Sequence, residues 1–400
     1  MTLPPYYAPE FTLDIDGRPA PAALRSAVTQ LTYTTGLGAS DRVELQLTND
    51  GLRWLDDPAI ALDRELSLAL GYLPDRLETA FVGEIVSHAA AFPSGSAPTL
   101  TVAAQDRMQK LQSGGKARWF AIPIPKFGNT PLPDAAVGAT VALEHGLVPI
   151  FEPVGAALAV ILGGADAAAA LGGPGGMQKL IRKQEGESDF DFLSRLSLEN
   201  GWELHIEHGG ALGGHQLRFF SPLDHLSPDL TLAYGRSLLD FSPRLSKVGQ
   251  LASVTAHVWI SQTKTRVSVT VGWDWDRSQL TVEISPAFSG TRGGDSAVTV
   301  DQPVTPASAP REILSKLVPR LNQRLTATAS TVGDVRLRAG AVVRIEGVGV
   351  EFGGLYRVTS ATHTIGGGGY RTRFEARKEI WFGSIPLPEQ GAVPARVGLA

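Results

Sequence analysis

The 400-residue sequence contains no cysteine. Disulfide bonds and thiolate metal sites are therefore excluded, and any folded state depends on packing and hydrogen bonding alone. A chain of this length can bury a substantial core without such cross-links. Its 43% hydrophobic residues are typical of a globular protein. Charged residues are scarce at 19%, which we interpret as a sign that partners cover part of the surface.

Signals for export, membranes and nucleic acids are also lacking. The start, Met1–Tyr7, has no basic stretch followed by an apolar one, so no secretory signal is predicted. A net charge of −4 resembles neither a nucleic-acid nor a membrane-surface footprint. The segment from Val154 to Gly173 is nearly all apolar and about as long as a membrane span. Because it contains Asp166 and consists mainly of weakly inserting Ala and Gly, we expect protein rather than lipid to cover it.

Local motifs for enzymatic chemistry are missing as well. Gly172–Gly176 lacks the Lys-Ser/Thr ending of a phosphate-binding loop, and Gly347-Val-Gly349 has the wrong spacing to Gly353 for a dinucleotide fingerprint. No nucleophile elbow is present, although a triad dispersed along the chain would leave no local signature. We predict no catalytic residue and no cofactor.

Histidines are the one group with a metal-like clustering. The cluster contains His205, His208, His215 and His225, and with Glu207 these side chains could ligate a metal. His205 is expected on the polar face of a strand, and the next two flank a Gly-Gly turn. We therefore expect solvated histidines in a hairpin and no metal site.

The first region, residues 1–112, is rich in strand patterns. Residues 43–48, 66–70 and 100–103 alternate apolar and polar side chains, and turn residues separate them. Short strands at this spacing predict a small β-barrel or sandwich.

The middle region, residues 113–230, mixes helices and strands. One helix is predicted from Asp134 to Glu144, ended by Gly146. A second begins at the N-cap Ser188, with Asp191 three residues later, and ends at Asn200-Gly201 before a strand at 202–206. Its side chains Phe192, Leu193 and Leu196 share one face and are predicted to be core.

The apolar segment 154–173 lies between these two helices. Gly163-Gly164 and Gly172–Gly176 interrupt it, and glycine is costly inside a helix. We therefore expect a mobile segment that a partner covers, with Val160, Ile161 and Leu162 as candidate interface residues. Burial within its own domain is the alternative.

The last region, residues 231–385, is again mostly β. Strands are predicted at 267–271 and 280–284 around a hairpin, 273–277, and at 341–345, 355–358 and 370–374. An amphipathic helix is predicted near 311–326, and residues 386–400 are predicted to be a tail. Trp273 and Trp275 are candidate interface residues, with ordinary packing as an equal alternative.

Three distinctive stretches follow one another along the chain, at 187–203, 234–239 and 340–374. They have an acidic Ser-Asp-Phe helix entry, a Tyr-Gly segment and Gly-rich alternating strands. In this order, they resemble the phage late-control protein D family and the hub part of VgrG spike proteins. The residues that carry the resemblance are Ser188, Asp189, Phe192, Leu193, Leu196, Gly201, Tyr234, Gly235, Gly347, Gly349, Phe352, Gly354, Tyr356, His363, Tyr370, Thr372 and Phe374.

The resemblance implies a mainly β fold class: two small β-barrels of the tail-hub type, plus a mixed α/β domain inserted between them. It implies a structural baseplate hub of a phage tail or contractile injection system, not an enzyme. The hub would be a homotrimer whose ring joins a sixfold tube to a threefold spike. Implied partners are the spike protein, the inner tube protein and baseplate wedge components, with the tape-measure protein as a further candidate. The particle would assemble in the bacterial cytoplasm. The spike would be a separate chain or lost, since spike-fused members continue beyond the hub.

Two other functions remain open at this point. A tail-tip hub with cell-wall hydrolase activity would need an inserted hydrolase domain, for which no segment has room. A carbohydrate-binding β protein would need an aromatic platform, but aromatic residues are 7% and scattered.

Overall fold

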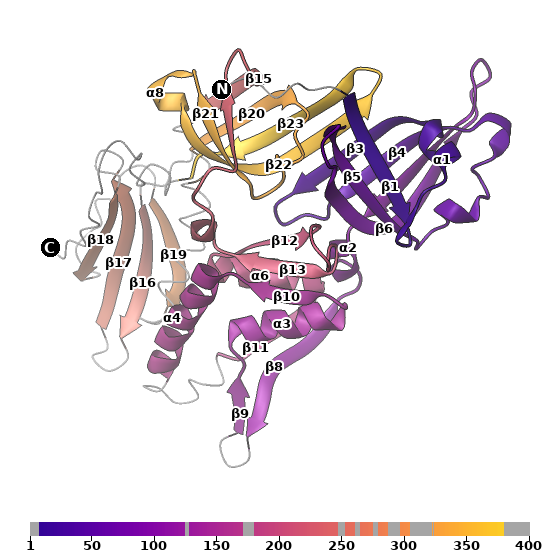
Figure 1. Ribbon diagram of the computed structural model, residues 1–400. Coiled ribbons are helices and arrows are strands. Elements are labelled where there is room, and N and C mark those ends of the chain that lie inside the picture. The colour runs from indigo at the N-terminus through magenta and orange to yellow at the C-terminus, as the bar shows by residue number, and fades with distance from the viewer. Residues whose placement is uncertain are drawn as a thin grey trace.

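The computed structural model describes residues 8–124, 128–170, 180–246, 253–260, 265–274, 279–286, 297–304, 322 and 324–379. Within them the chain is mainly β, with one large, largely antiparallel sheet and smaller sheets beside it (Figure 1). The expected mainly β class is confirmed.

The first region supplies one half of the large sheet. Its strands are β1 (Ala8–Ile15), β2 (Arg18–Pro19), β3 (Val28–Gly36), β4 (Arg42–Thr48), β5 (Glu65–Leu73), β6 (Glu78–Ala91) and β7 (Thr99–Gln105). Short helices α1 (Ala22–Ala27), η1 (Asp50–Leu52), η2 (Pro58–Ile60) and α2 (Met108–Leu111) connect or cover them. The predicted alternation holds in β4, where Val43, Leu45 and Leu47 are buried and the residues between them are not.

The last region supplies the other half. Its strands in this sheet are β14 (Leu230–Ala233), β15 (Leu238–Leu245), β20 (Leu325–Val332), β21 (Val342–Glu346), β22 (Gly354–Gly366) and β23 (Gly369–Arg377), with the short helix α8 (Gly349–Phe352). The strand order along the sheet is β15-β20-β23-β22-β3-β4-β7-β6-β5-β1-β2. Off this path, β21 pairs with β22, and β14 pairs with β21.

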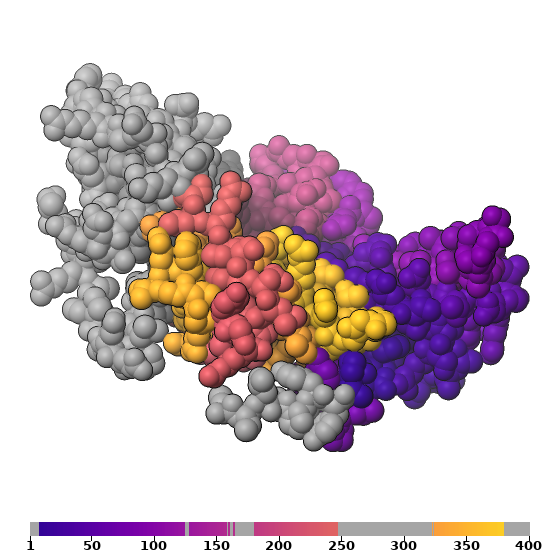
Figure 2. Space-filling model, turned by 90° about the horizontal axis from the view of Figure 1, so that it is seen from above, coloured from indigo at the N-terminus to yellow at the C-terminus, as the bar shows by residue number. Residues whose placement is uncertain are grey.

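The two regions are not separate barrels in the described pairings. Ser360–Ile365 of β22 pair with Gly36–Leu31 of β3, so one sheet runs through both. The length of β22 allows this pairing. Along one edge of its 13 residues, β21 pairs with the start of the strand and β3 pairs with the end. Seen from above, the yellow strands of the last region lie directly against the indigo first region (Figure 2).

Among its described residues, the middle region has two small sheets and three α-helices. β10 (Val148–Phe151), β12 (Glu203–Glu207) and β13 (Gln216–Phe220) form one sheet, and β8 (Lys116–Ile124), β9 (Gly128–Pro131) and β11 (Arg182–Glu187) form the other. The helices are α3 (Asp134–Glu144), α4 (Pro153–Ala170) and α6 (Asp189–Asn200), with the short η3 (Pro222–Asp224). One core cluster lies mainly in these elements and also contains Met108 and Leu111 of α2. A second cluster lies mainly in the first region, and a third lies in the last region.

Helix α6 follows its sequence signals. The Ser188 hydroxyl accepts the Asp191 N–H at 3.1 Å, and Gly201 ends the helix with φ of 67°. Phe192, Leu193 and Leu196 are buried as the shared face predicted. Phe192 stacks on Phe120 of β8 with ring centroids 5.1 Å apart, which fixes the helix against the sheet.

The interruption expected at Gly163-Gly164 was wrong, and the one expected at Gly172–Gly176 lies outside the described residues. Pro153–Ala170 form one helix that passes through Gly163-Gly164. Asp224 accepts the N–H groups of Val154 and Gly155, and Trp202 donates to the Gly155 carbonyl at 2.9 Å, so the helix start is anchored on the middle region. No helix in the described part of the chain is long and apolar enough to cross a membrane.

A four-stranded sheet stands apart from the others. It contains β16 (Ser253–Ile260), β17 (Thr265–Asp274), β18 (Gln279–Pro286) and β19 (Ala297–Val304), in the order β18-β17-β16-β19. The predicted strands at 267–271 and 280–284 pair antiparallel, as expected of a hairpin.

The predicted helix near 311–326 and the predicted tail 386–400 lie outside the described residues, except for the end of the helix. There the prediction is wrong, because Leu325 and Thr326 begin β20. Period-two alternation from Leu325 to Val332 buries every second side chain and therefore favours a strand.

Candidate functional site

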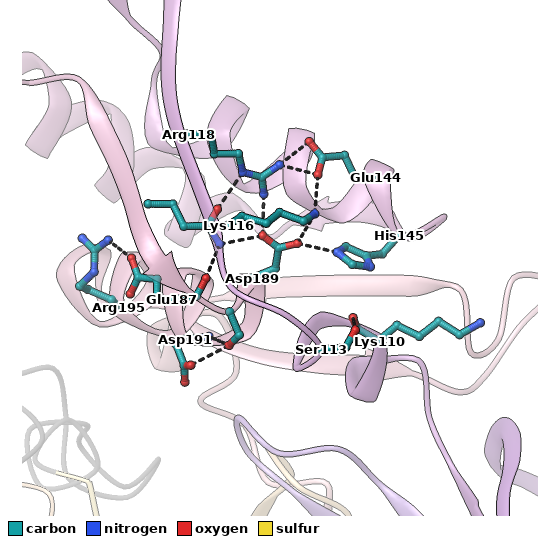
Figure 3. Close-up of polar contacts among 12 residues, drawn as sticks. Lys110, Ser113, Lys116, Arg118, Glu144, His145, Glu187, Asp189, Asp191 and Arg195 are labelled. Carbon is teal, nitrogen blue, oxygen red and sulfur yellow. Dashed lines mark hydrogen bonds and ion pairs between the residues drawn. The ribbon is translucent and has the colours of Figure 1, made fainter.

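The first residue of α6, Asp189, carries a buried carboxylate that four donors reach (Figure 3). Its Oδ1 accepts from Arg118 at 2.6 Å and from Gln184 at 2.9 Å. Its Oδ2 accepts from His145 Nε2 and from Lys116 Nζ, both at 2.7 Å. The cluster thus ties β8, β11 and the end of α3 to the start of α6.

The charge of Asp189 is strongly stabilised. Burial alone raises the pKa of its carboxyl, but hydrogen bonds from His145, Lys116 and Gln184 and the charge of Arg118 outweigh it and hold the pKa at about 2. The start of α6 adds a favourable helix dipole for an anion.

This arrangement leaves no room for acid–base chemistry at Asp189. A carboxylate has about four acceptor positions, and four donors already use them. A general base must have a free position within reach of a substrate proton. We therefore describe the Asp189 cluster as an anchor between elements. The sequence singled out Ser188 and Asp189 but missed Arg118, Lys116 and His145, because no local pattern links β8 to α6.

A second buried polar group joins the first region to the middle region. Asp41, in the turn after β3, accepts from the Tyr33 hydroxyl at 2.9 Å and from the Gly36 N–H at 3.2 Å. His208, which follows β12, donates from Nε2 to the same carboxylate at 3.0 Å. This bond crosses between regions that are far apart in sequence.

The expectation that His208 is solvated was wrong, since only 4% of it is exposed. The Val82 N–H donates to its Nδ1 at 3.1 Å, and its ring lies 5.4 Å from that of Phe81. Because Nδ1 accepts this hydrogen bond, it carries no proton. The ring proton therefore lies on Nε2 and points toward Asp41.

This tautomer bears on metal binding. Asp41, Asp106 and His208 offer ligand atoms within 4.8 Å of one another. A metal needs a lone pair on a ring nitrogen, however, and here one nitrogen carries the proton while the other accepts Val82. The carboxylate of Asp106 accepts hydrogen bonds from the Ser40 hydroxyl at 2.7 Å and from the Met108 N–H at 3.0 Å. Burial and the neighbouring Asp41 raise the pKa of Asp106.

The other clustered histidines are spread over different contacts. His205 packs edge-on against Phe220, and burial lowers the pKa of its imidazole to about 4. His215 contacts Arg107, and His225 packs against Phe220. In the described residues, none of these three joins His208 in a group of possible metal ligands.

His363 is the centre of a third buried polar group and lies in β22. Its Nε2 donates to the Leu337 carbonyl at 3.0 Å, and its Nδ1 faces the hydroxyls of Tyr370 at 2.9 Å and Thr372 at 3.0 Å. Its ring stacks on Tyr33 with centroids 5.3 Å apart. The structure therefore brings three residues of the family resemblance together and places them against the Asp41 group.

The remaining residues of the resemblance shape turns and core. The Tyr234 N–H donates to the Glu346 carbonyl at 3.0 Å, and its side chain is exposed. Gly347 has φ of 78° and would place a Cβ 3.6 Å from the Tyr234 backbone, so two turns meet there. Glycines with positive φ in the same set are Gly201, Gly235, Gly349 and Gly354. The apolar members pack in the last-region cluster: Phe352, Tyr356 and Phe374.

The candidate interface residues belong to α4 and to the segment around β17. Val160 of α4 is 74% exposed, while the side chains of Ile161 and Leu162 lie outside the described residues. Trp273 is in β17 with its backbone opposite Leu280, and Trp275 lies outside the described residues.

All three regions line a cavity of about 640 Å³. Its walls include Tyr33 of the first region, Glu207 and Arg218 of the middle region, and Arg338 of the last. Glu207 lies 3.4 Å from Arg218 and 3.2 Å from Arg338. These ion pairs link the regions across the cavity, so we describe it as a junction rather than a substrate pocket.

Known structures resemble the whole chain. A tail protein from Neisseria meningitidis MC58 matches with a TM-score of 0.58 and 10% identity, over 93% of this chain and 97% of that one. The 43 kDa tail protein of prophage MuSo2 from Shewanella oneidensis matches with a TM-score of 0.59 and 13% identity, over 92% and 98%. The chain has the fold of the phage tail proteins. The expected resemblance to that group is confirmed at the level of fold.

The tail-protein fold also occurs in a secretion component. The E. coli c3393 protein, described as a component of the type VI secretion system with structural similarity to T4 bacteriophage tail proteins gp27 and gp5, matches with a TM-score of 0.55 and 14% identity. That match covers 96% of this chain and 79% of the other. A model of the Alg8 N-terminal domain matches residues 176–367, slightly under half of the chain. No curated protein matches the sequence.

Proposed function

We propose that this chain is a structural baseplate hub of a phage tail or contractile injection system. The observation that carries the proposal is the shared fold with the two tail proteins, which extends over more than nine tenths of this chain and of each of them. Such a match leaves no part of the described chain for an added catalytic domain. The saturated carboxylate of Asp189 agrees with a role that turns over no substrate.

We further propose three domains for the hub. They are a first β domain at 1–112, a mixed domain at 113–230 and a second β domain at 231–385, followed by a tail at 386–400. Three core clusters support this division, since one lies mainly in the first region, one mainly in the middle region and one in the last region. The two β domains share a sheet through β3 and β22, so we infer that they act as one rigid third of the ring and resemble open or distorted barrels rather than independent ones.

In the assembled hub, three copies would form a ring that presents six similar β domains to a sixfold tube and three mixed domains to a threefold spike. The partners would be the spike protein, the inner tube protein and the wedge components of the baseplate, with the tape-measure protein as a candidate near the channel. The exposed Val160 on α4 supports a role for that helix in covering one of these contacts. The hub would assemble in the bacterial cytoplasm.

Native mass measurement of the purified chain, alone and with its spike protein, tests this proposal. We expect a trimer in at least one of the two samples. A strict monomer in both would contradict the hub.

A further inference from the structure

The cavity at the junction of the three regions is lined by more positive than negative side chains. Four arginines and three carboxylates line it, so its charged side chains carry a net charge of +1 with the histidines counted as neutral. These residues are Arg76, Arg218, Arg336 and Arg338, and Glu78, Glu207 and Asp229. The volume of about 640 Å³ is within the range of ordinary ligand sites. One added negative charge would therefore both fit the cavity and neutralise its lining.

Two of these arginines share one carboxylate. Oε1 of Glu207 accepts from Nη1 of Arg338 at 3.2 Å and from the Gly209 N–H at 3.0 Å. Oε2 of Glu207 lies 3.4 Å from Nη1 of Arg218. A guanidinium group has five N–H donors, so Glu207 alone cannot provide acceptors for both arginines.

Arg218, on β13, is the arginine with the poorest contacts of this kind. Its side chain is only 29% exposed, and its second ion pair, with Glu152, is 3.3 Å long. Both of its ion pairs are longer than an ordinary N–H···O hydrogen bond, which ends near about 3.2 Å. Its Nε is buried and has no hydrogen-bond partner among the described residues. A buried donor without an acceptor is unfavourable, so an oxygen acceptor beside Arg218 would stabilise it.

His205, on β12, has the same shortage. It lies directly opposite Arg218 in the pairing of β12 with β13, so the two side chains share one face of the sheet. Its Nδ1 is buried and has no hydrogen-bond partner in the part of the chain that the structure describes. A neutral imidazole can carry its proton on Nδ1 and donate from there. Two neighbouring side chains that line the same cavity therefore both have a nitrogen that lacks a partner.

We propose that this cavity binds a carboxylate or phosphate group, held by the guanidinium groups of Arg218 and Arg338 with His205 as a further donor. The planar guanidinium fork matches both kinds of group, because each presents two oxygens to two parallel N–H donors. The ligand would be bound and not converted, and it would add a link between the three regions. This inference goes beyond the hub function and does not depend on it.

Calorimetric titration of the full chain tests the site, with inorganic phosphate and citrate as separate probes in a buffer of low ionic strength at pH 7. We expect one equivalent of at least one probe to bind with a Kd of about 1 mM or lower, which corresponds to about −4 kcal/mol or better. Tighter binding of phosphate would assign the site to phosphate-bearing ligands, and tighter binding of citrate would assign it to carboxylates. Absence of binding by both probes would overturn the proposal.

Three variants test which residues hold the probe. Arg218→Gln and Arg338→Gln each remove a charged donor, and we expect each to weaken binding by about tenfold or more. Glu207→Gln removes the acid that competes for both arginines, so it should tighten binding by about threefold or more. General damage to the fold would not tighten binding. Thermal melts without probe establish which variants fold, and Arg338→Gln remains informative if Arg218→Gln does not, because Arg338 is half-exposed.

Arg373→Gln is the matched control. Arg373 is exposed on β23 and is not among the residues that line the cavity, so its loss should leave the Kd unchanged. If Arg373→Gln weakened binding as much as Arg338→Gln, the probe would be attracted by positive charge in general, and the site would be overturned. Weaker binding by a folded Glu207→Gln variant would also contradict the arrangement. None of these measurements requires a trimer, so failure of the site and failure of the hub are distinguishable.

Discussion

Replacing Asp189 by asparagine should separate a buried anchor from an ordinary surface acid. The change keeps the size of the side chain, so it leaves no cavity, but it removes the charge that Arg118, Lys116 and His145 surround. The N–H₂ group of the new asparagine would also point at two hydrogen-bond donors, where the aspartate offered them an acceptor oxygen. Removing one partner of a buried ion pair typically costs about 3–5 kcal/mol. Because Lys116 is 39% exposed and Arg118 is 21% exposed, water can partly replace the lost partner, and we expect about 3 kcal/mol.

Urea denaturation at pH 7 measures this loss, and Glu187→Gln is the matched control. Glu187 pairs with Arg195, whose side chain is 42% exposed, so that variant should lose less than about 1 kcal/mol. The folded-state pKa of Asp189 lies below its ordinary value, so its contribution should be complete above pH 4 and fade as pH falls toward about 2. Equal, small losses for both variants at pH 7 would refute the anchor.

Three further changes have defined outcomes. Burial lowers the pKa of His363 to about 4, below its ordinary 6.5. The unfolded chain binds the extra proton between these values, so the contribution of His363 to stability should fall by about 3 kcal/mol as pH drops from 6.5 to 4. His363→Gln should reduce the slope of stability against pH in denaturation curves by that amount. Leu193→Ala should cost about 2–5 kcal/mol at its fully buried site, and an unchanged melting temperature would place the residue outside the core. Gly333→Ala would set a Cβ 2.0 Å from the Tyr370 ring, so the variant should lose about 3 kcal/mol; a melt like that of the parent chain would contradict this packing.

Much of the local structure could be predicted because local signals decide it. The capped helix from Ser188 to Gly201 agrees with its sequence pattern, and so do the alternating strands at 43–48 and 370–374. In each case the residues that specify the element are neighbours along the chain. The family resemblance added the overall fold, which no periodicity could have supplied.

Contacts between distant residues were not predictable in the same way. The pairing of β3 with β22 joins residues more than 300 positions apart, and nothing in either strand marks its partner. His208 was expected in solvent because it adjoins a Gly-Gly turn, yet its partners Asp41 and Val82 come from another region. A buried histidine next to a turn leaves no local trace when distant residues bury it.

The apolar segment was misjudged for a different reason. Glycine lowers helix stability by about 1 kcal/mol, and the pair Gly163-Gly164 suggested an interruption. Asp224 and Trp202 hold the first turn of α4, and such tertiary contacts override a propensity cost of this size.

The proposed function of this chain is that of a hub between tube and spike. Electron cryomicroscopy of the assembled particle, with this chain carrying a small tag, tests it directly. We predict three copies in one ring at the point where the sixfold tube meets the threefold spike, with β3 and β22 of each copy paired inside the ring wall. A particle in which the tagged chain lies elsewhere, or in a number other than three at that junction, would contradict the claim.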